Sequence, residues 1–586
     1  GDDRPDGPPE VLLDGWGYQD THETLNAFTW GPDGWLYGCH GVFTYSNVGA
    51  PGTPDEERVS IDAGVWRYHP TDRTFEVFAE GTSNPWGVDF DSRGEAFVSA
   101  CVIPHFYHLV PGARYQRQAG SHDDPYTFAD LPTIADHRHF VGDSPHGGNG
   151  RSDGAGGGHA HCGLLVYQGG AFPAEYRDSA LFFNVHGNRM NRDLLVPDGA
   201  TYVASHGEDL LRANDAWFRG ISARTGPHGE VFFIDWYDQQ ACHLNDAARW
   251  DRSNGRLYRL RYGDLESAAI DLPTMDEADL VGLAFGDDVW AGRRARRLLQ
   301  ERGLSEDSSR ALDARLAASA NATQRLHALW TLGACRSIAP ERLLEVLAKD
   351  EDPTVRGWAA RFLGEVGTSD LAGALAARAA IEQDPVVLRQ LASAAQRFEV
   401  DARWPLLRAL AHSEPAMAER TTELVTWYGL EDCVGLDPVQ GLALVRGCAS
   451  DTLQEFAVRR AAATDASLPA LVAHLGALED RAEQLRTLDA LQEALGDRRG
   501  VEAPEGWDSI YGRSLALGDA ELDQRLTPIA ARFGDARAFP ALRTWLAEDG
   551  ERRDLAFEVL VAAKDPGTRE VLITWLADPA ADRKST

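Results

Sequence analysis

The sequence predicts a multidomain protein, a β-propeller followed by an all-α solenoid. Before residue 264, a short β-hairpin with a glycine-containing turn recurs three times. From about residue 276 onward, the spacing of apolar residues changes from every second residue to a period of about 3.6. The histidines follow the same division, since fifteen of the eighteen lie before residue 264. We therefore expect a propeller over residues 1–263, a linker over 264–275 and helical repeats over 276–586.

Composition limits the possible partners. The 586 residues are 43% hydrophobic and 25% charged, which is typical of a globular protein. A formal net charge of −33 argues against nucleic acid, because its phosphates would be repelled. No apolar run approaches the roughly 18–20 residues that cross a bilayer, and no signal peptide stands at the front. The acidic charge fits a salty or extracytoplasmic setting. We therefore expect a periplasmic or extracellular protein without a transmembrane segment.

The seven cysteines are widely spaced and form no Cys-x-x-Cys pair. The sequence therefore contains neither a zinc knuckle nor a motif for covalent haem attachment. Free, partly buried thiols are the expected state, with one or two disulfides as the alternative.

Each recurring hairpin joins two β-prone runs through a four-residue turn. The first joins residues 27–30 to residues 35–38 through Gly-Pro-Asp-Gly. The other two turns are Asp-Ser-Arg-Gly at 91–94 and Gly-Pro-His-Gly at 226–229. Three copies of this hairpin favour a propeller over a sandwich or a barrel. The strands amount to about four blades, so we expect a ring that begins partway round or is completed by another polypeptide.

A glycine-rich stretch at 147–158 leads into His159 and His161. Glycine lets a backbone approach a ligand or another strand closely, because no side chain intervenes. Two short strands follow, over 163–167 and 180–185. Imidazoles at strand ends suit a polar site at the rim of a sheet. The alternative is a flexible surface loop that contains histidines by chance.

We expect the polar side chains of this rim to face one central pocket, because loops at one end of a propeller gather round its axis. Histidine there can serve as ligand, base or hydrogen-bond donor without a fixed charge at neutral pH. The expected members of the pocket are His159, His161, His186 and Arg189, with His22 and His40 on its wall.

Two His-x-His pairs are candidate metal ligands, because alternate residues of a strand point to one face. They are His137 with His139 and His159 with His161, and imidazole suits zinc or copper. In the alternative, these rings only form hydrogen bonds with neighbouring backbone. Carboxylate donors such as Asp215 suit calcium instead.

Several segments of the first half resemble known proteins. They resemble the glucose/sorbosone dehydrogenase-like propellers and, more closely, the PVC-type (planctomycete) membrane-bound dehydrogenase family. The matching segments are DTHETLNAFTWGPDGWLYG, EGTSNPWGVDFDSRGEAFVSA, HAHCGLLVYQGGAFPAEYRDSALFFNVHG, ASHGEDLLRANDAWFR and FFIDWYDQQACH.

This resemblance implies a quinoprotein in which a histidine before the hairpin takes a proton from the substrate. His22 stands nine residues before Gly31, close to that pattern. The relatives have Arg-Asn before proline where the quinone binds, whereas this chain has Ser83 and Asn84. The missing cation weakens the case for PQQ, an anionic quinone. The candidates for cofactor binding are Asn84, His40 and Arg219.

The second half has the pattern of HEAT-like repeats. The dipeptide Asp-Pro opens a helix at residues 352–353 and again 32 residues later at 384–385. Aspartate caps the free amides of a helix and proline fits its first turn. A solenoid is favoured over a plain helical bundle, and it offers a long surface for a protein partner. In the family that the first half resembles, such a domain often accompanies a c-type cytochrome module.

The resemblance implies an extracytoplasmic oxidoreductase that acts on sugars or sugar alcohols. The expected cofactor is PQQ or a divalent metal (calcium, zinc or copper), with no covalent haem in this chain. The predicted catalytic residues are His22, His161, His186 and Arg189, and the predicted metal ligands are His137, His139, His159 and Asp215. The alternative is a non-catalytic protein that binds carbohydrate or acts as an assembly scaffold.

Overall fold

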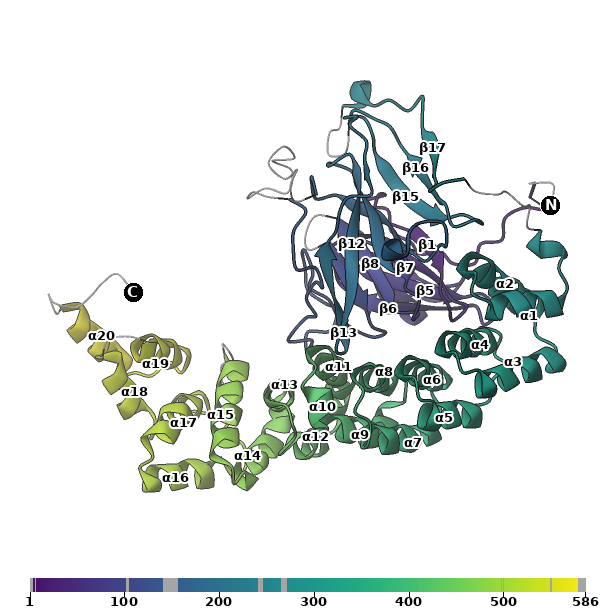
Figure 1. The fold of residues 1–586 in the computed structure, drawn as a ribbon. Coiled ribbons are helices and arrows are strands. Elements are labelled where there is room, and N and C mark those ends of the chain that lie inside the picture. Colours follow the sequence, from purple (N-terminus) through teal and green to yellow (C-terminus); the bar gives the residue numbers. More distant parts are fainter. Residues whose placement is uncertain are drawn as a thin grey trace. The chain divides into compact units, whose positions relative to one another are not determined.

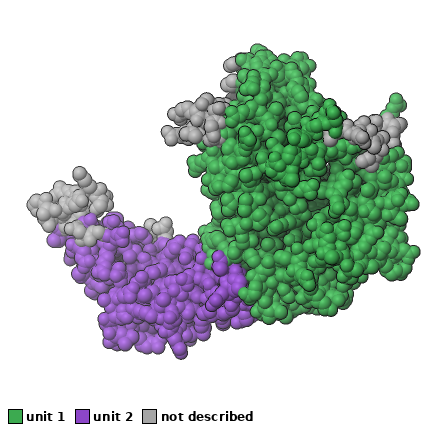
Figure 2. Space-filling model, viewed as in Figure 1, with its two compact units in different colours: residues 1–398, 419–425 green, residues 399–418, 426–586 purple. Residues whose placement is uncertain are grey.

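The computed structural model describes most of the chain as strands followed by helices (Figure 1). Its description leaves out residues 1–3, 6, 102–104, 141–155, 241–245, 265–270, 497, 499, 549–550 and 578–586. The rest forms two compact units, residues 1–398 with 419–425 and residues 399–418 with 426–586 (Figure 2). Half of the expected linker 264–275 therefore lies outside the described residues.

The described strands form five open antiparallel sheets. The first contains β1 (Asn26–Trp30), β2 (Leu36–His40), β5 (Gly64–His69) and β6 (Thr74–Glu80), and β3 (Ser46–Val48) pairs with β4 (Val59–Ile61). The next contains β7 (Asn84–Phe90), β8 (Ala96–Cys101) and β9 (Phe106–Leu109). The largest contains β10 (His161–Tyr167), β11 (Ser179–Asn184), β12 (Arg189–Asp198), β13 (Thr201–His206) and β14 (Leu211–Arg212). The last contains β15 (Gly220–Thr225), β16 (Val231–Asp235) and β17 (Arg256–Leu260).

All three predicted hairpins are present, as β1–β2, β7–β8 and β15–β16. Each turn ends in a glycine with positive φ, at Gly34, Gly94 and Gly229 (84°, 76° and 82°), which a residue with a side chain adopts only with strain. The first strands of the four larger sheets are neighbours in the order β1, β7, β10, β15. Among the described strands, hydrogen bonds do not close these sheets into a barrel. The propeller therefore stays a prediction.

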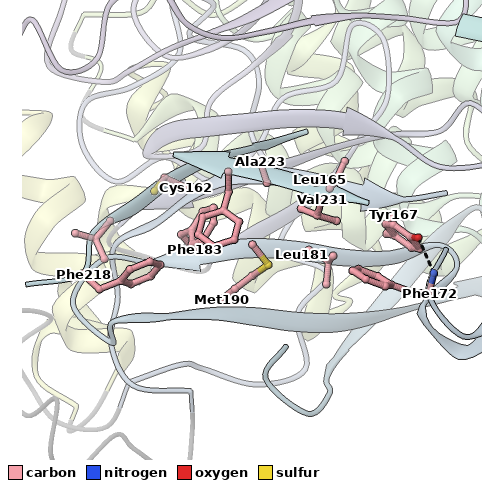
Figure 3. Close-up of a cluster of buried hydrophobic side chains, with 12 residues drawn as sticks. Cys162, Leu165, Tyr167, Phe172, Leu181, Phe183, Met190, Phe218, Ala223 and Val231 are labelled. Carbon is pink, nitrogen blue, oxygen red and sulfur yellow. Dashed lines mark hydrogen bonds between the residues drawn. The ribbon is translucent and has the colours of Figure 1, made fainter. Parts of the chain in front are cut away.

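The sheet β10–β14 is buried on both faces and forms the middle layer of the core. Its alternate residues point to opposite sides, as in any strand. One face packs against β15 and β16 through Phe183, Met190, Phe218 and Phe233 (Figure 3). The other face packs against β8 and β9. This double burial explains why its strands are rich in apolar residues on both faces.

The helices continue the chain in the pattern expected for HEAT repeats. Asp352 and Asp384 cap their helices as predicted, because each side chain accepts hydrogen bonds from the next two free amides. The first unit contains α1 (Glu277–Phe285), α2 (Val289–Arg302), α3 (Glu306–Ala318), α4 (Ala322–Ala334), α5 (Pro340–Lys349), α6 (Pro353–Val366), α7 (Ser369–Ala379) and α8 (Pro385–Ala395).

The second unit continues the helical repeats on its own. Alternate helices α13, α15, α17 and α19 lie against one another in sequence, as in a solenoid. The described helices that follow α8 are α9 (Val400–Ala411), α10 (Glu414–Met417), α11 (Arg420–Leu436), α12 (Pro438–Val445), α13 (Asp451–Ala461), α14 (Leu468–Ala477), α15 (Arg481–Leu495), α16 (Trp507–Leu517), α17 (Ala520–Arg532), α18 (Phe539–Leu546), α19 (Glu551–Ala562) and α20 (Thr568–Ala577).

Within the first unit, helices α2, α4, α6 and α8 lie against the hairpin turns of the sheets (Figure 1). Gln300 of α2 donates a hydrogen bond to the carbonyl of Gly34 (3.0 Å). Trp358 of α6 donates one through its indole nitrogen to the carbonyl of Arg93 (2.8 Å). The turns of the first two hairpins therefore also contact the helical repeats.

Buried ion pairs reinforce these contacts. Asp33, in the first turn, accepts from Tyr37 (2.6 Å) and from Arg361 of α6 (2.6 Å). Glu95, which follows the second turn, is paired with Arg389 of α8. Burial raises the pKa of Glu95, but the charge of Arg389 outweighs it and the pKa falls to about 2. Arginines from the helices therefore accompany both buried carboxylates.

We expect Arg389→Met to destabilise the first unit by about 3–5 kcal/mol, because it leaves Glu95 buried without its cation. Arg310→Met, which removes an exposed arginine of α3, should change the stability by less than about 0.5 kcal/mol. Denaturant unfolding followed by tryptophan fluorescence measures both. The wild-type protein should lose this contribution as the pH falls from about 4.5 toward 2, because the folded-state pKa of Glu95 is depressed. Equal effects of the two variants would contradict this assignment.

Candidate metal centre

Five histidines gather round one buried carboxylate at the end of the β10–β14 sheet. The carboxylate belongs to Asp193 of β12, which has 0% exposure. Strands and loops that are distant in sequence supply the imidazoles. His105 precedes β9, His161 begins β10, His206 ends β13, and His137 and His139 lie in the loop that follows residue 132.

Three imidazole nitrogens surround one oxygen of Asp193, Oδ1. His137 Nε2 lies 3.3 Å from it, His139 Nε2 3.4 Å and His206 Nδ1 3.7 Å. The nitrogens are also close to one another: His139 Nε2 is 2.9 Å from His137 Nε2 and 3.2 Å from His206 Nδ1. His105 Nε2 forms a hydrogen bond of 2.8 Å with the other oxygen of Asp193.

These distances match a tetrahedral coordination shell. Ligand atoms bound to zinc at about 2.0–2.1 Å stand roughly 3.3–3.4 Å apart in a tetrahedron. Five of the six separations among His137, His139, His206 and Asp193 lie between 2.9 and 3.7 Å. An overlapping set, with His105 in place of His206, also has all its ligand atoms within 4.8 Å of one another. Three nitrogens and one oxygen suit zinc or copper better than calcium.

Proton counting gives a second reason for a cation. Each of the three nitrogens carries at most one proton, so three protons serve five close contacts and at least two contacts have no hydrogen bond of their own. Asp193 Oδ1 is buried and accepts no hydrogen bond of normal geometry from a described residue. A bound cation would satisfy the oxygen and the lone pairs at once.

The ionisation of these groups also favours metal binding. Burial, aided by the neighbouring His105, lowers the pKa of His139 to about 3, so this ring is neutral. Burial raises the pKa of Asp193, but its contacts with the histidines outweigh this and hold the pKa well below 3.8. His137 is the exception: burial lowers its pKa, but Asp193 and Asp136 outweigh this and raise it, so a proton competes with a metal for this ring.

A glycine-lined support holds the centre in place. Gly158 donates a backbone hydrogen bond to the carbonyl of His139 (2.8 Å). A Cβ on Gly156 would stand 2.9 Å from the ring of His139, and Gly157 has a φ of 93°. Asn191 binds the carbonyl of Gly156 (3.1 Å). The predicted close approach of this glycine stretch is therefore present at its described end.

The structure separates the other predicted residues from this centre. His159 stacks on His186 with ring centroids 4.4 Å apart. Arg189 pairs with Asp209 (2.9 Å), and Asp215 accepts from the backbone amide of Trp217 (2.9 Å). The single pocket expected from the sequence is thus divided into a centre round Asp193 and a separate His159–His186 stack.

The residues predicted to bind substrate or cofactor lie elsewhere in the β region. His22 is exposed and bonds to Asp20 (2.9 Å). Both ring nitrogens of His40 are used, by Ser46 (2.7 Å) and by the carbonyl of Gly41. Asn84 accepts from the amide of Val42 (3.5 Å). Arg219 donates to the carbonyls of Val185, Phe218 and Gln239.

His105 and Asp193 are the members that the sequence did not suggest. Asn191 and Asp193 alternate with Met190 and Arg192 in a buried strand, and buried polar residues at alternate positions are a signal of a site. His105 carries no such signal, since it reaches the centre only through the pairing of β8 with β9. The two expected His-x-His strands are also corrected: His137 and His139 lie in a loop, and His159 precedes β10.

Comparison with known proteins assigns the two parts of the chain. Residues 1–264 match the family model of a domain of unknown function, DUF7133, and residues 309–396 match HEAT repeats. No curated protein and no solved structure matches the chain. The first part of the chain is thus a β-sheet-rich region similar to this domain of unknown function, and the helical region that follows contains HEAT repeats.

The structure also bears on the expectations about a transmembrane segment and about the cysteines. No helix among the described residues is long and apolar enough to span a membrane. Cys39, Cys162, Cys335, Cys433 and Cys448 are free thiols, as expected, and Cys242 lies outside the described residues.

We expect Gly157→Ala to lower the stability of the β region by about 1–3 kcal/mol, because a side chain is strained at its φ and would displace Arg189. The matched control is Gly170→Ala in the next loop, where no atom lies within 4 Å of an added Cβ. Thermal unfolding measures both. A Gly157→Ala protein as stable as the control would show that the glycine stretch is not required for packing.

Proposed function

We propose that the DUF7133 domain is a metal-binding domain with a zinc or copper ion held by His137, His139, His206 and Asp193. The five close contacts among their ligand atoms support this proposal most directly. His105 and His161 would hold two of these ligands in orientation, because they contact Asp193 and His139 at 2.8 and 3.0 Å.

We also propose that the domain is a propeller of four blades. Each first strand, β1, β7, β10 and β15, has an irregular register near its start. Arg224 of β15 donates to the carbonyl of Phe28 in β1 (2.8 Å), which links the last large sheet to the first. Repetition of one strand feature in neighbouring sheets is what equivalent blades would have.

The activity that we propose for this centre is oxidation of sugars or sugar alcohols outside the cytoplasm. Its support is the resemblance of the sequence to sugar dehydrogenase-like propellers. A redox-active copper ion in an imidazole site would replace the quinone, whose arginine contact is missing at Ser83. Oxidation of an alcohol to a carbonyl releases two electrons and two protons, so an external electron acceptor, such as a c-type cytochrome, is required.

The HEAT repeats favour a role in binding another protein, because helical repeats present extended surfaces. This observation also supports the alternative function, a non-catalytic protein that binds carbohydrate or organises an assembly. In that case the metal would be structural, and the chain would turn over no substrate.

Metal analysis of the purified protein tests the centre. We expect about one zinc or copper ion per chain in the wild type, and at least a tenfold weaker affinity in His139→Ala. His228→Gln, in the hairpin turn at the far end of β15, should retain the metal. Wild-type protein that binds neither ion on titration would contradict the proposal.

An activity assay then separates the two functions. Metal-dependent reduction of an artificial electron acceptor by a sugar alcohol would support the oxidoreductase. Metal binding without turnover across a panel of sugars and sugar alcohols would support the non-catalytic alternative.

A further inference from the structure

Asp136 contacts the ring of a proposed metal ligand, its neighbour His137. Oδ1 of Asp136 lies 2.9 Å from Nδ1 of His137, and Nε2 of the same ring lies 3.3 Å from Oδ1 of Asp193 at the centre. The side chain of Asp136 is 49% exposed, so its carboxylate is ionised at neutral pH and can only accept hydrogen bonds. His137 is therefore the donor of this contact, and Nδ1, on the side of the ring away from the centre, carries a proton.

A second contact ties Asp136 to the sheet. Ser205 of β13 donates a hydrogen bond from its hydroxyl to Oδ2 of Asp136 (2.6 Å). The backbone of the loop also pairs with this strand, because the amide of Ala204 donates to the carbonyl of Ile134 (2.9 Å) and the amide of Asp136 donates to the carbonyl of Ala204 (3.0 Å). Ser205 directly precedes His206, another proposed ligand. Asp136 therefore joins the loop that carries two ligands to the strand that ends in a third.

The other two proposed imidazole ligands lack a contact of this kind with any residue that the structure describes. Nδ1 of His139 faces another ring, since Nε2 of His161 lies 3.0 Å away. Nε2 of His206 is 3.9 Å from Oδ1 of Asp209, which is too long for a hydrogen bond. His137 is thus the ligand whose second nitrogen is bonded to a carboxylate. In metal sites such a carboxylate fixes the tautomer and orientation of the ring and makes its other nitrogen more basic.

We propose that Asp136 is a positioning residue of the metal centre: it holds His137 with a proton on Nδ1, so that the lone pair of Nε2 points to the metal. This role rests on the proposed metal-binding function and adds to it a residue that does not itself touch the ion. A metal at Nε2 would require the proton to stay on Nδ1, where Asp136 accepts it. Without the carboxylate, the ring could rotate or bind through its other nitrogen.

A purely structural role for Asp136 predicts a different result. In that case the residue would only hold the loop on β13, and its removal would lower the stability of the metal-free protein. Contacts of a half-exposed carboxylate contribute little to folding, because water competes for them. Removal of a carboxylate that bonds to a metal-binding imidazole weakens metal binding by about 10–100-fold. Metal affinity and metal-free stability therefore distinguish the two roles.

The test measures both quantities on protein freed of metal with a chelator. Competition with a chelating dye gives the affinities for zinc and copper, and thermal unfolding before metal is added gives the stability. We expect Asp136→Ala to bind the metal about 10–100-fold more weakly than the wild type, with the Tm of the metal-free protein lowered by less than about 2 °C. Asp136→Asn keeps an oxygen acceptor without the charge and should lie between the two. Asp198→Ala removes an exposed carboxylate at the end of β12 and should bind as the wild type does.

A spectroscopic signature completes the test, with Cu²⁺ as the probe. The electron paramagnetic resonance spectrum of Asp136→Ala should differ from that of the wild type, because the donation from His137 changes. Asp198→Ala should reproduce the wild-type spectrum.

The outcomes separate this role from the proposed function. A wild-type protein that binds neither zinc nor copper would contradict the metal centre itself, and with it the role of Asp136. A wild-type protein that binds a metal, together with an Asp136→Ala variant of equal affinity and unchanged spectrum, would overturn the role of Asp136 alone. So would equal losses of affinity in Asp136→Ala and Ser205→Ala, because Ser205→Ala removes only the tie to β13. If Asp136→Ala fails to fold, Asp136→Asn takes its place, and wild-type affinity in that variant would overturn the role as well.

Discussion

The carboxylate of Asp193 is the constraint on which the site depends. It lies in β12 with no exposure to solvent, and a buried charge is stable only when partners surround it. The imidazoles that reach it come from β9, β10, β13 and the loop that carries His137 and His139. The glycine stretch and Asn191 then hold that loop against the sheet. A cation bound among these imidazoles would satisfy this one oxygen atom.

The same constraint explains how the helical repeats attach to the sheets. The chain has a net charge of −33, yet its buried carboxylates at the hairpin turns are paired with arginines of α6 and α8. The first two hairpin turns therefore reverse the chain direction and also present a carboxylate or carbonyl to a helix.

Local patterns in the sequence predicted the local structure well. The three glycine-containing turns, the Asp-Pro helix starts and the close packing of the glycine stretch each depend on a few adjacent residues, and all are present. The propeller depends on how whole sheets are arranged, which no short pattern determines, and it remains a prediction. Only the coarser statement, a β-sheet-rich domain followed by HEAT repeats, is established.

The site was predicted only in part, for a related reason. His137, His139 and His161 were recognised as candidates because they belong to His-x-His pairs. Their partners are Asp193, which strand pairing places beside His206, and His105, whose side chain contacts Asp193 from 88 positions away. Conversely, His159 and His186 were expected in the same pocket because loops at one end of a propeller gather round its axis, whereas their rings stack on each other.

An X-ray absorption spectrum of the metal-loaded protein tests the central claim most directly. The account predicts a first shell of three imidazole nitrogens and one carboxylate oxygen at about 2.0–2.1 Å for zinc, and loss of the oxygen contribution in Asp193→Ala. A first shell without imidazole, or a spectrum that is unchanged in Asp193→Ala, would contradict it.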